Sequence, residues 1–305
     1  MKRDWKNYNQ ELVRRGEILI DPEIFDAQAQ NKQTKKLGRP FKYPRALILF
    51  ILFFKYTLRL PYRQTEGFVR TLFRKMGMST DLLNFRTIHY RHNREELHFD
   101  HLPDNPKDLP QGFVIVLDST GMKLTNRGEW LSKKHGKKRK KGWIKVHVAI
   151  DISSGRVLDM KVTDNKTHDS QCAVELVENS VKKVESLGGN VKEVIADTGI
   201  DSHEIFRHLA SRGIKPVIKV RRDAVITDNK ARDDVVREIR KGRKRWKEKN
   251  EYGRRWHVES LFSSFKRWFG EYVSSVKFEN IRKELMFKVM ITNMFLSGSI
   301  GMLVR

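Results

Sequence analysis

Hydrophobic and polar positions follow two different patterns along the chain, and the pattern changes near residue 110. Up to about residue 105, apolar residues recur at helical spacing, in segments separated by the turn-forming sequences GRPFKYP, LPYR, GMSTD and LPDNP. From residue 112 these segments are replaced by short β-rich runs, FVIVLDST, WIKVHVAIDI and GRVLDMKVT. The last two runs are joined by SSG, which is typical of a hairpin turn. The pattern predicts a helical N-terminal part followed by a mixed α/β part.

The α/β part has a regular order of predicted elements. The three strands are followed by a helix that begins near THDS, a strand EVIAD, a helix SHEIFRHLASRG, a strand KPVIKV and a closing helix RRWHVESLFSSFKRWFG. This succession is that of a ribonuclease H-like fold, in which helices flank a mixed sheet. We therefore expect a helical domain at residues 1–108 and a ribonuclease H-like domain at residues 109–305. A basic segment at 220–251 is expected to be either a basic helix or arm, or a disordered charged loop.

The helical part contains a possible nucleic-acid-binding motif. Two short amphipathic segments, LPYRQTEGFVRTLFRKMG and STDLLNFRTIHYRHNR, are separated by a turn with Gly and Ser, which is the outline of a helix-turn-helix. The second segment carries Arg86 and Arg91, which we expect to contact DNA. A small helical bundle with a solvated basic face is the alternative interpretation.

Charge narrows the class of partner. The 305 residues include 62 Lys and Arg against 37 Asp and Glu, a formal net charge of +25, which indicates a polyanionic partner such as nucleic acid. The longest apolar run, ALILFILFF at 46–54, is far shorter than the roughly 20 residues of a membrane span, so we expect it in a buried core. The N-terminal residues lack the apolar stretch of a signal peptide, and a single cysteine, Cys172, cannot form an intramolecular disulfide. A cytoplasmic protein without a membrane partner is expected.

A second basic region lies between two predicted strands. Eight Lys or Arg residues and no acid occur between residues 133 and 145. Because like charges at this density repel one another, an anion such as a DNA phosphate is expected to bind there, and a solvated loop is the alternative. The expected phosphate contacts are Lys137, Lys138, Arg139, Lys140 and Lys141.

Three carboxylates are candidates for chemistry. Asp118 and Asp197 each come directly after an apolar strand, and two parallel neighbouring strands would place both at one edge of a sheet. Glu259 lies at the border between the polar and apolar faces of the closing helix, where it could lean over the strand ends. Carboxylate oxygens are typical ligands of Mg²⁺, and two such ions can assist an in-line phosphoryl displacement. The sequence has no Cys or His cluster with zinc spacing and no Gly-rich phosphate loop, so neither zinc nor a nucleotide cofactor is expected.

The closing helix also carries a family resemblance. The spacing Tyr252-x2-Arg255-x3-Glu259-x6-Lys266, together with LDST at Asp118 and ADTGIDS at Asp197, resembles the Tyr-Arg-Glu-Lys signature of DDE transposases from bacterial and archaeal insertion sequences. The resemblance implies a catalytic triad of Asp118, Asp197 and Glu259 that binds two Mg²⁺ ions, with Mn²⁺ as a substitute. It also implies that Arg255 and Lys266 contact DNA near the cleaved strand and that Tyr252 positions the terminal nucleotides.

The same resemblance implies an activity. The expected protein binds the terminal inverted repeats of its element, cleaves the element ends by metal-assisted phosphodiester hydrolysis, and joins the freed 3′-hydroxyl to target DNA. It would act on double-stranded DNA as a homodimer, in the nucleoid of a prokaryotic cell. Two alternatives stay open: a metal-dependent DNA nuclease of the same fold without strand transfer, and a catalytically silent DNA-binding protein.

Overall fold

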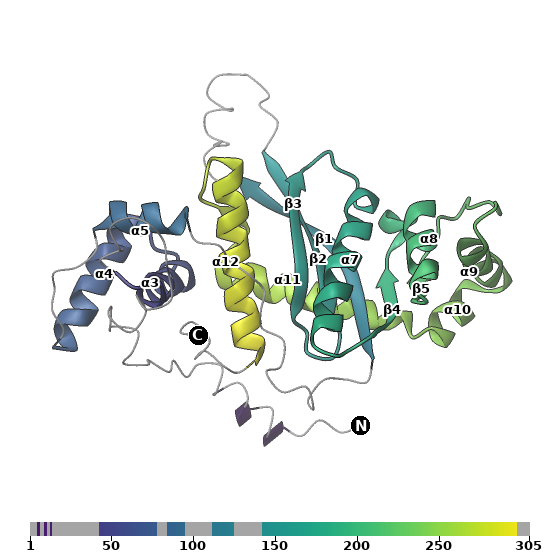
Figure 1. The fold of residues 1–305 in the computed structure, drawn as a ribbon, viewed down its shortest axis with the longest axis horizontal. Coiled ribbons are helices and arrows are strands. Elements are labelled where there is room, and N and C mark those ends of the chain that lie inside the picture. The colour runs from purple at the N-terminus through teal and green to yellow at the C-terminus, as the bar shows by residue number, and fades with distance from the viewer. Residues whose placement is uncertain are drawn as a thin grey trace. The chain divides into compact units, whose positions relative to one another are not determined.

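The computed structural model describes residues 5–6, 9–10, 13, 43–77, 84–94, 112–124 and 142–297. The chain divides into two compact units, one formed by residues 1–98 with 277–305 and the other by residues 99–276. In the described residues the first unit is helical and the second is built on a mixed sheet (Figure 1). The helical-then-α/β order expected from the hydrophobic pattern is confirmed.

The second unit contains one sheet. Its strand order is β3-β2-β1-β4-β5, and β6 pairs with the far end of β1. The pairs β1–β2 and β2–β3 are antiparallel, whereas β4 is parallel to β1 and β5 is parallel to β4. This is the ribonuclease H-like arrangement predicted from the sequence. The strands are β1 (Phe113–Leu124), β2 (Trp143–Asp151), β3 (Val157–Asp164), β4 (Val191–Ala196), β5 (Lys215–Ile218) and β6 (Tyr272–Val273).

The register of the parallel strands aligns their carboxyl ends. Leu117 of β1 lies opposite Ala196 of β4, and Ala196 lies opposite Ile218 of β5. All three of these apolar residues are fully buried, which fixes the register because a one-residue slip would expose them. The residues that follow them therefore come to one level at the edge of the sheet.

Helices of the second unit pack around this sheet. Their buried faces are apolar, and α7 contacts β2 and β3, α8 contacts β5 and α11 contacts β1. Cys172 lies in the buried face of α7. The helices are α7 (Ser170–Ser186), α8 (His203–Ser211), α9 (Lys230–Lys241), α10 (Arg243–Lys249) and α11 (Trp256–Phe269), with 3-10 turns at Thr198–Ile200 and Tyr252–Arg255.

The basic segment at 220–251 is ordered. It contains α9 and α10, which confirms the expectation of a basic helix and makes the disordered loop wrong. Trp246 of α10 is 3% exposed, and its ring lies 5.3 Å from that of Tyr252. Burying an indole gives α10 a fixed seat despite its high charge.

The first unit is a helical bundle that includes the C-terminal helix. The apolar run at 46–54 lies in α3 and is almost wholly buried, as expected of core. Phe287 of α12 packs on Tyr56, with ring centroids 5.3 Å apart, and Phe295 packs on Phe53 at 6.1 Å. The helices are α3 (Arg45–Thr57), α4 (Tyr62–Lys75), α5 (Phe85–His92) and α12 (Phe278–Ser297). The expected second domain at 109–305 is therefore too long. Residues 277–305 belong to the helical unit, where α12 packs on α3.

Buried polar groups join α5 to this bundle. Both ring nitrogens of His92 form hydrogen bonds. Nδ1 lies 2.7 Å from Tyr62 Oη, and Nε2 lies 3.2 Å from Tyr56 Oη. Burial lowers the pKa of His92 to about 3, so the ring is neutral. Arg91 is also buried and donates to the main-chain oxygen of Tyr43 at 2.8 Å. The prediction that Arg91 contacts DNA is therefore corrected, since this guanidinium is used inside the bundle.

The first unit otherwise fits both sequence interpretations. Its packing is that of a small helical bundle, and Arg86 remains exposed on α5 beside the Phe85 ring. Across the ranges that the structure describes, there is no helix of the length and apolar character that crossing a membrane requires.

Candidate active site

Asp118 lies at the level where the parallel strands end. Its Oδ1 accepts from the backbone N–H of Ser119 at 2.8 Å, and its Oδ2 accepts from Nη1 of Arg255 at 2.7 Å. Burial raises the pKa of this carboxyl to about 6, and the negative charges of Asp197 and Asp169 add to that effect, whereas Ser119 and Arg255 oppose it. The effect of burial on this pKa therefore outweighs that of the ion pair with Arg255.

Asp197 follows β4 and begins the next turn. Its Oδ1 accepts from the backbone N–H of Gly199 at 2.7 Å, which caps the 3-10 turn. A Cβ added to Gly199 would lie 3.0 Å from Asp197 Oδ1 and 3.3 Å from Oδ2 of Asp169. The two carboxylates thus face the same small space, which a glycine leaves open.

Glu259 reaches the site through Arg255. It lies in the first turn of α11, between the buried residues Val258 and Leu261, and its side chain is 57% exposed. Nη2 of Arg255 donates to Oε1 of Glu259, while Nη1 donates to Asp118. One guanidinium therefore holds a carboxylate from β1 and a carboxylate from α11.

Tyr252 lies beneath these groups. It is buried, and its pKa is raised to about 12, chiefly by burial and also by the carboxylates of Asp197, Asp118 and Glu259, while Arg255 opposes the rise. Its hydroxyl is accordingly protonated at neutral pH. All three predicted acids thus act on the pKa of one residue, and their convergence on a common metal site stays a prediction.

The side chains as they stand do not form a ready metal site. Within the ranges the structure describes, no three His, Cys, Asp or Glu side chains are grouped closely enough to hold a metal ion. The guanidinium of Arg255 lies between Asp118 and Glu259 and is the counter-charge of both carboxylates. The donor set nevertheless has the right chemistry for Mg²⁺ or Mn²⁺, since it consists of carboxylate oxygens.

Asp169 is a fourth acid near Asp118 and Asp197. It is the N-cap residue of α7, but its side chain makes no capping hydrogen bond. Its Oδ1 instead lies 3.1 Å from Nζ of Lys145 and 3.4 Å from Nδ1 of His147, both on β2. In the sequence, only the i, i+2 spacing of Lys145 and His147 could have indicated this contact of Asp169. That spacing puts both side chains on one face of a strand, where they could pair with an acid.

The predicted DNA contacts lie in different surroundings. Lys266 is half-buried on α11, Arg86 is exposed, and Arg255 is 23% exposed and paired with acids. Tyr252 is buried, so a contact with nucleotides would need it to be uncovered. Five predicted phosphate contacts fall outside the described residues: Lys137, Lys138, Arg139, Lys140 and Lys141.

Comparison with known proteins shows the family to which the chain is similar. Residues 110–294 match a family model described as a transposase DDE domain, and residues 13–127 match a second model with that description. The simian T-cell lymphotropic virus intasome in complex with PP2A regulatory subunit B56 gamma is similar over 74% of this chain and 67% of its own, with 14% identity and a TM-score of 0.30. The Mos1 mariner paired end complex with Mn is similar over 81% and 91%, with 10% identity and a TM-score of 0.25.

TM-scores this low support no conclusion, and the assignment depends on the family models. The first model spans more than half of the chain and includes the strands and helices that carry Asp118, Asp197 and Glu259. The chain therefore belongs to the DDE transposases, a family of enzymes that cleave and join DNA.

Proposed function

We propose that this transposase uses Asp118, Asp197 and Glu259 to bind two divalent metal ions, Mg²⁺ or Mn²⁺, at the sheet edge. The observation that carries the proposal is the guanidinium of Arg255, which pairs with Asp118 and Glu259 at once while Asp197 lies close enough to affect the same arginine and Tyr252. Three acids from distant positions in the chain thus share one counter-charge. A buried carboxylate with a raised pKa beside further acids is the pattern of a site that awaits cations.

The bound ions would activate the attacking oxygen and stabilise the leaving oxygen of an in-line displacement at phosphorus. The residues of this chain have separate tasks. Asp118 on β1 and Asp197 directly after the adjacent β4 hold fixed ligand positions, whereas the exposed Glu259 side chain can move to complete them. Cations would replace Arg255 as the counter-charge of Asp118, which leaves its planar guanidinium to bind a DNA phosphate.

The substrate is proposed to be the double-stranded DNA of the element ends and the target. The net charge of +25 provides the sequence-independent part of the affinity. Arg86, Lys266 and the basic residues 137–141 are proposed as phosphate contacts, and recognition of terminal inverted repeats is assigned to the helical unit. The working complex is proposed to be a homodimer, because two element ends are joined in one event. The proposed location is the nucleoid in the cytoplasm of a prokaryotic cell, where such DNA lies.

The test uses the full chain, Mg²⁺, a target plasmid and a labelled duplex that ends in the inverted repeat found beside the gene. We expect strand cleavage at the repeat end followed by a joined product of higher mass. Asp118→Ala, Asp197→Ala and Glu259→Ala should each abolish both products while leaving DNA binding intact. Asp234→Ala is the matched control, because Asp234 is an exposed acid that pairs with Arg237 on α9.

The outcomes separate the three candidate functions. Cleaved ends without joined product would identify a nuclease and refute strand transfer. Binding without cleavage in Mg²⁺ or Mn²⁺ would identify a DNA-binding protein and refute catalysis.

A further inference from the structure

A cationic cluster lies beside the acids on the β5 side of the sheet edge. Lys219 directly follows Ile218 of β5, and Ile218 pairs with Ala196 of β4, so Lys219 leaves β5 at the level where Asp197 leaves β4. The backbone N–H of Lys219 donates to the oxygen of Ala196 at 3.2 Å, which extends the ladder to this residue. The sheet edge therefore carries Asp118 on β1, Asp197 just after β4 and Lys219 just after β5.

Helix α10 adds two further cations to Lys219. Arg243 and Lys247 are four residues apart, so they lie on one face of α10, about 40° from each other. The buried Trp246 fixes the orientation of this helix through its contact with Tyr252, and Nζ of Lys247 lies 6.0 Å from the centre of the Tyr252 ring. Burial has the largest effect on the pKa of Lys219 and lowers it; the positive charges of Arg243 and Lys247 lower it further, whereas Asp197 raises it.

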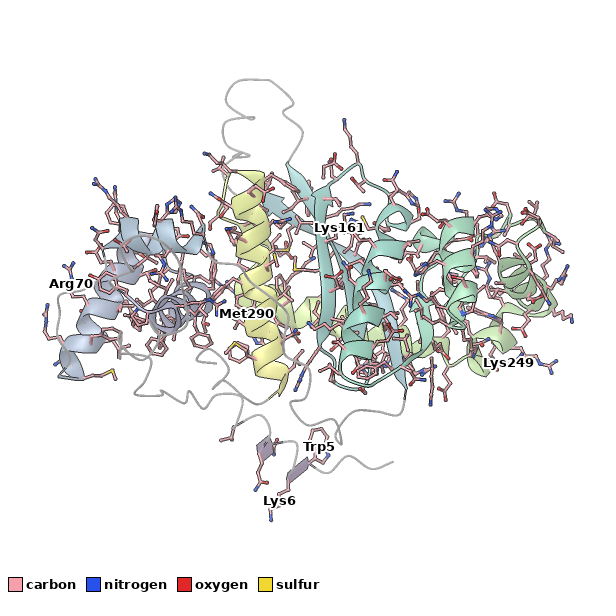
Figure 2. The ribbon with its side chains drawn as sticks, viewed as in Figure 1. Trp5, Lys6, Arg70, Lys161, Lys249 and Met290 are labelled. Atoms are coloured by element: carbon pink, nitrogen blue, oxygen red, sulfur yellow. The ribbon has the colours of Figure 1, made fainter. Side chains whose placement is uncertain are left out.

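These three cations lack the partners that other basic residues of α9 and α10 have. Arg237 pairs with Asp234, and Lys249 pairs with Glu238 at 2.6 Å. Within the part of the chain that the structure describes, the side chains of Lys219, Arg243 and Lys247 form no hydrogen bond or ion pair with another side chain. Lys249, at the end of α10, is labelled in Figure 2. Three unpaired like charges gathered at one place repel one another unless an anion binds there.

We propose that Lys219, Arg243 and Lys247 form a binding site for the DNA backbone, which holds phosphates next to the phosphate that is cleaved. The inference rests on the proposed function, because it places this site beside Asp197 on the assumption that DNA is cut there. The neighbouring carboxylates repel a polyanion, and the cluster offsets that repulsion on one side. It also restricts the direction of the bound strand, which must pass from the acids towards β5 and α10.

The experiment measures the salt dependence of DNA binding by the full chain. Fluorescence anisotropy with a fluorescein-labelled DNA duplex, at salt between about 50 and 200 mM, gives the slope of log affinity against log salt. Each phosphate contact contributes about 0.9 to this slope. We expect Arg243→Gln with Lys247→Gln to lower its magnitude by about 1.8, and Lys219→Gln to lower it by about 0.9.

Each cluster variant is compared with a control variant that loses the same number of positive charges elsewhere. Arg245→Gln with Lys249→Gln removes two charges from the opposite face of α10 and should leave the slope nearly unchanged. Lys215→Gln removes a charge from the other end of β5, where Lys215 pairs with Glu193. Lys219→Arg retains the charge and should retain the slope, which separates loss of the contact from a disturbed fold.

The results for this site and for the catalytic proposal are independent. Equal slopes for the cluster variants and their controls would overturn the binding site, even if the parent cleaves DNA. A parent that does not cleave DNA but shows the predicted loss of slope would support the binding site and refute the proposed function. If the parent cleaves, the cluster variants should also cleave more slowly than their controls at equal DNA occupancy, because the strand would be held less well.

Discussion

Asp118→Asn should stabilise the metal-free protein at neutral pH, although it should abolish catalysis. The side chain of Asp118 is 18% exposed, and burial raises its pKa from an ordinary 3.8 to about 6 despite the ion pair with Arg255. At 1.36 kcal/mol per pKa unit, keeping this carboxylate ionised in the folded state costs about 3 kcal/mol. Asparagine has nearly the same shape and can still accept from the N–H of Ser119, so the variant avoids this cost. We expect its free energy of unfolding to exceed that of the parent by up to about 3 kcal/mol.

The pH dependence follows from the same pKa. Well below pH 4 the carboxyl is protonated in both the folded and unfolded states, so the parent and the variant should be equally stable. As the pH rises towards 6, the unfolded state loses its proton first and the folded state retains it, so the stability of the parent falls relative to the variant. The full difference should be present above pH 6.

The assay is urea unfolding followed by circular dichroism from pH 4 to 8, with and without Mg²⁺. Mg²⁺ at about 100 times its dissociation constant should stabilise the parent by about 2.7 kcal/mol and the variant much less. Asp159→Asn is the control, because burial also raises the pKa of Asp159 but it lies on β3 and accepts from Asn179. This control should keep the full response to Mg²⁺. A less stable Asp118→Asn protein at pH 7, or a stability difference that is constant from pH 4 to 7, would refute the reasoning.

Three further predictions concern the neighbours of the acids and the helical unit. Gly199→Ala should weaken Mn²⁺ binding in calorimetry at least several-fold while changing stability by under about 1 kcal/mol, because a Cβ would lie 3.0 Å from Asp197 Oδ1; unchanged binding would show that this space is not used. Asp169→Asn should lower the cleavage rate with a smaller effect on DNA affinity, since Lys145 and His147 lose their carboxylate; loss of folding in circular dichroism instead would assign Asp169 a purely structural role. Phe287→Ala should destabilise the helical unit by about 3–5 kcal/mol and expose residues 43–94 to limited proteolysis, and equal protease resistance would argue against α12 as part of that core.

Much of the catalytic unit was predictable because short stretches of sequence determine its strands and helices. Apolar runs that end in Asp118 and Asp197 give both the strands and the sheet edge, since the parallel register of Leu117 and Ala196 brings the following residues together. The 3.6-residue period of α11 places Glu259 beside the buried Val258 and Leu261. Helical order in the 220–251 segment was one of two expectations, and the buried Trp246 decides between them.

Other features depend on contacts between residues far apart in sequence. Asp169 looks like a helix cap until Lys145 and His147 of β2 are beside it. An apolar helix such as α12 contains no indication of which unit it will join, and its place became clear only from its contacts with α3. Arg86 and Arg91 are five residues apart, about 140° around a helix, so they face different directions. Arg91 points into the bundle, where it donates to the main-chain oxygen of Tyr43, a residue far away in the sequence.

The most direct test of the central claim is anomalous diffraction from crystals of the full chain with Mn²⁺ and a DNA end. We predict manganese peaks in direct coordination with the carboxylates of Asp118, Asp197 and Glu259, and an Arg255 guanidinium that has left Asp118. Manganese bound elsewhere, or bound by Asp118 and Asp197 while Glu259 stays paired with Arg255, would contradict the account.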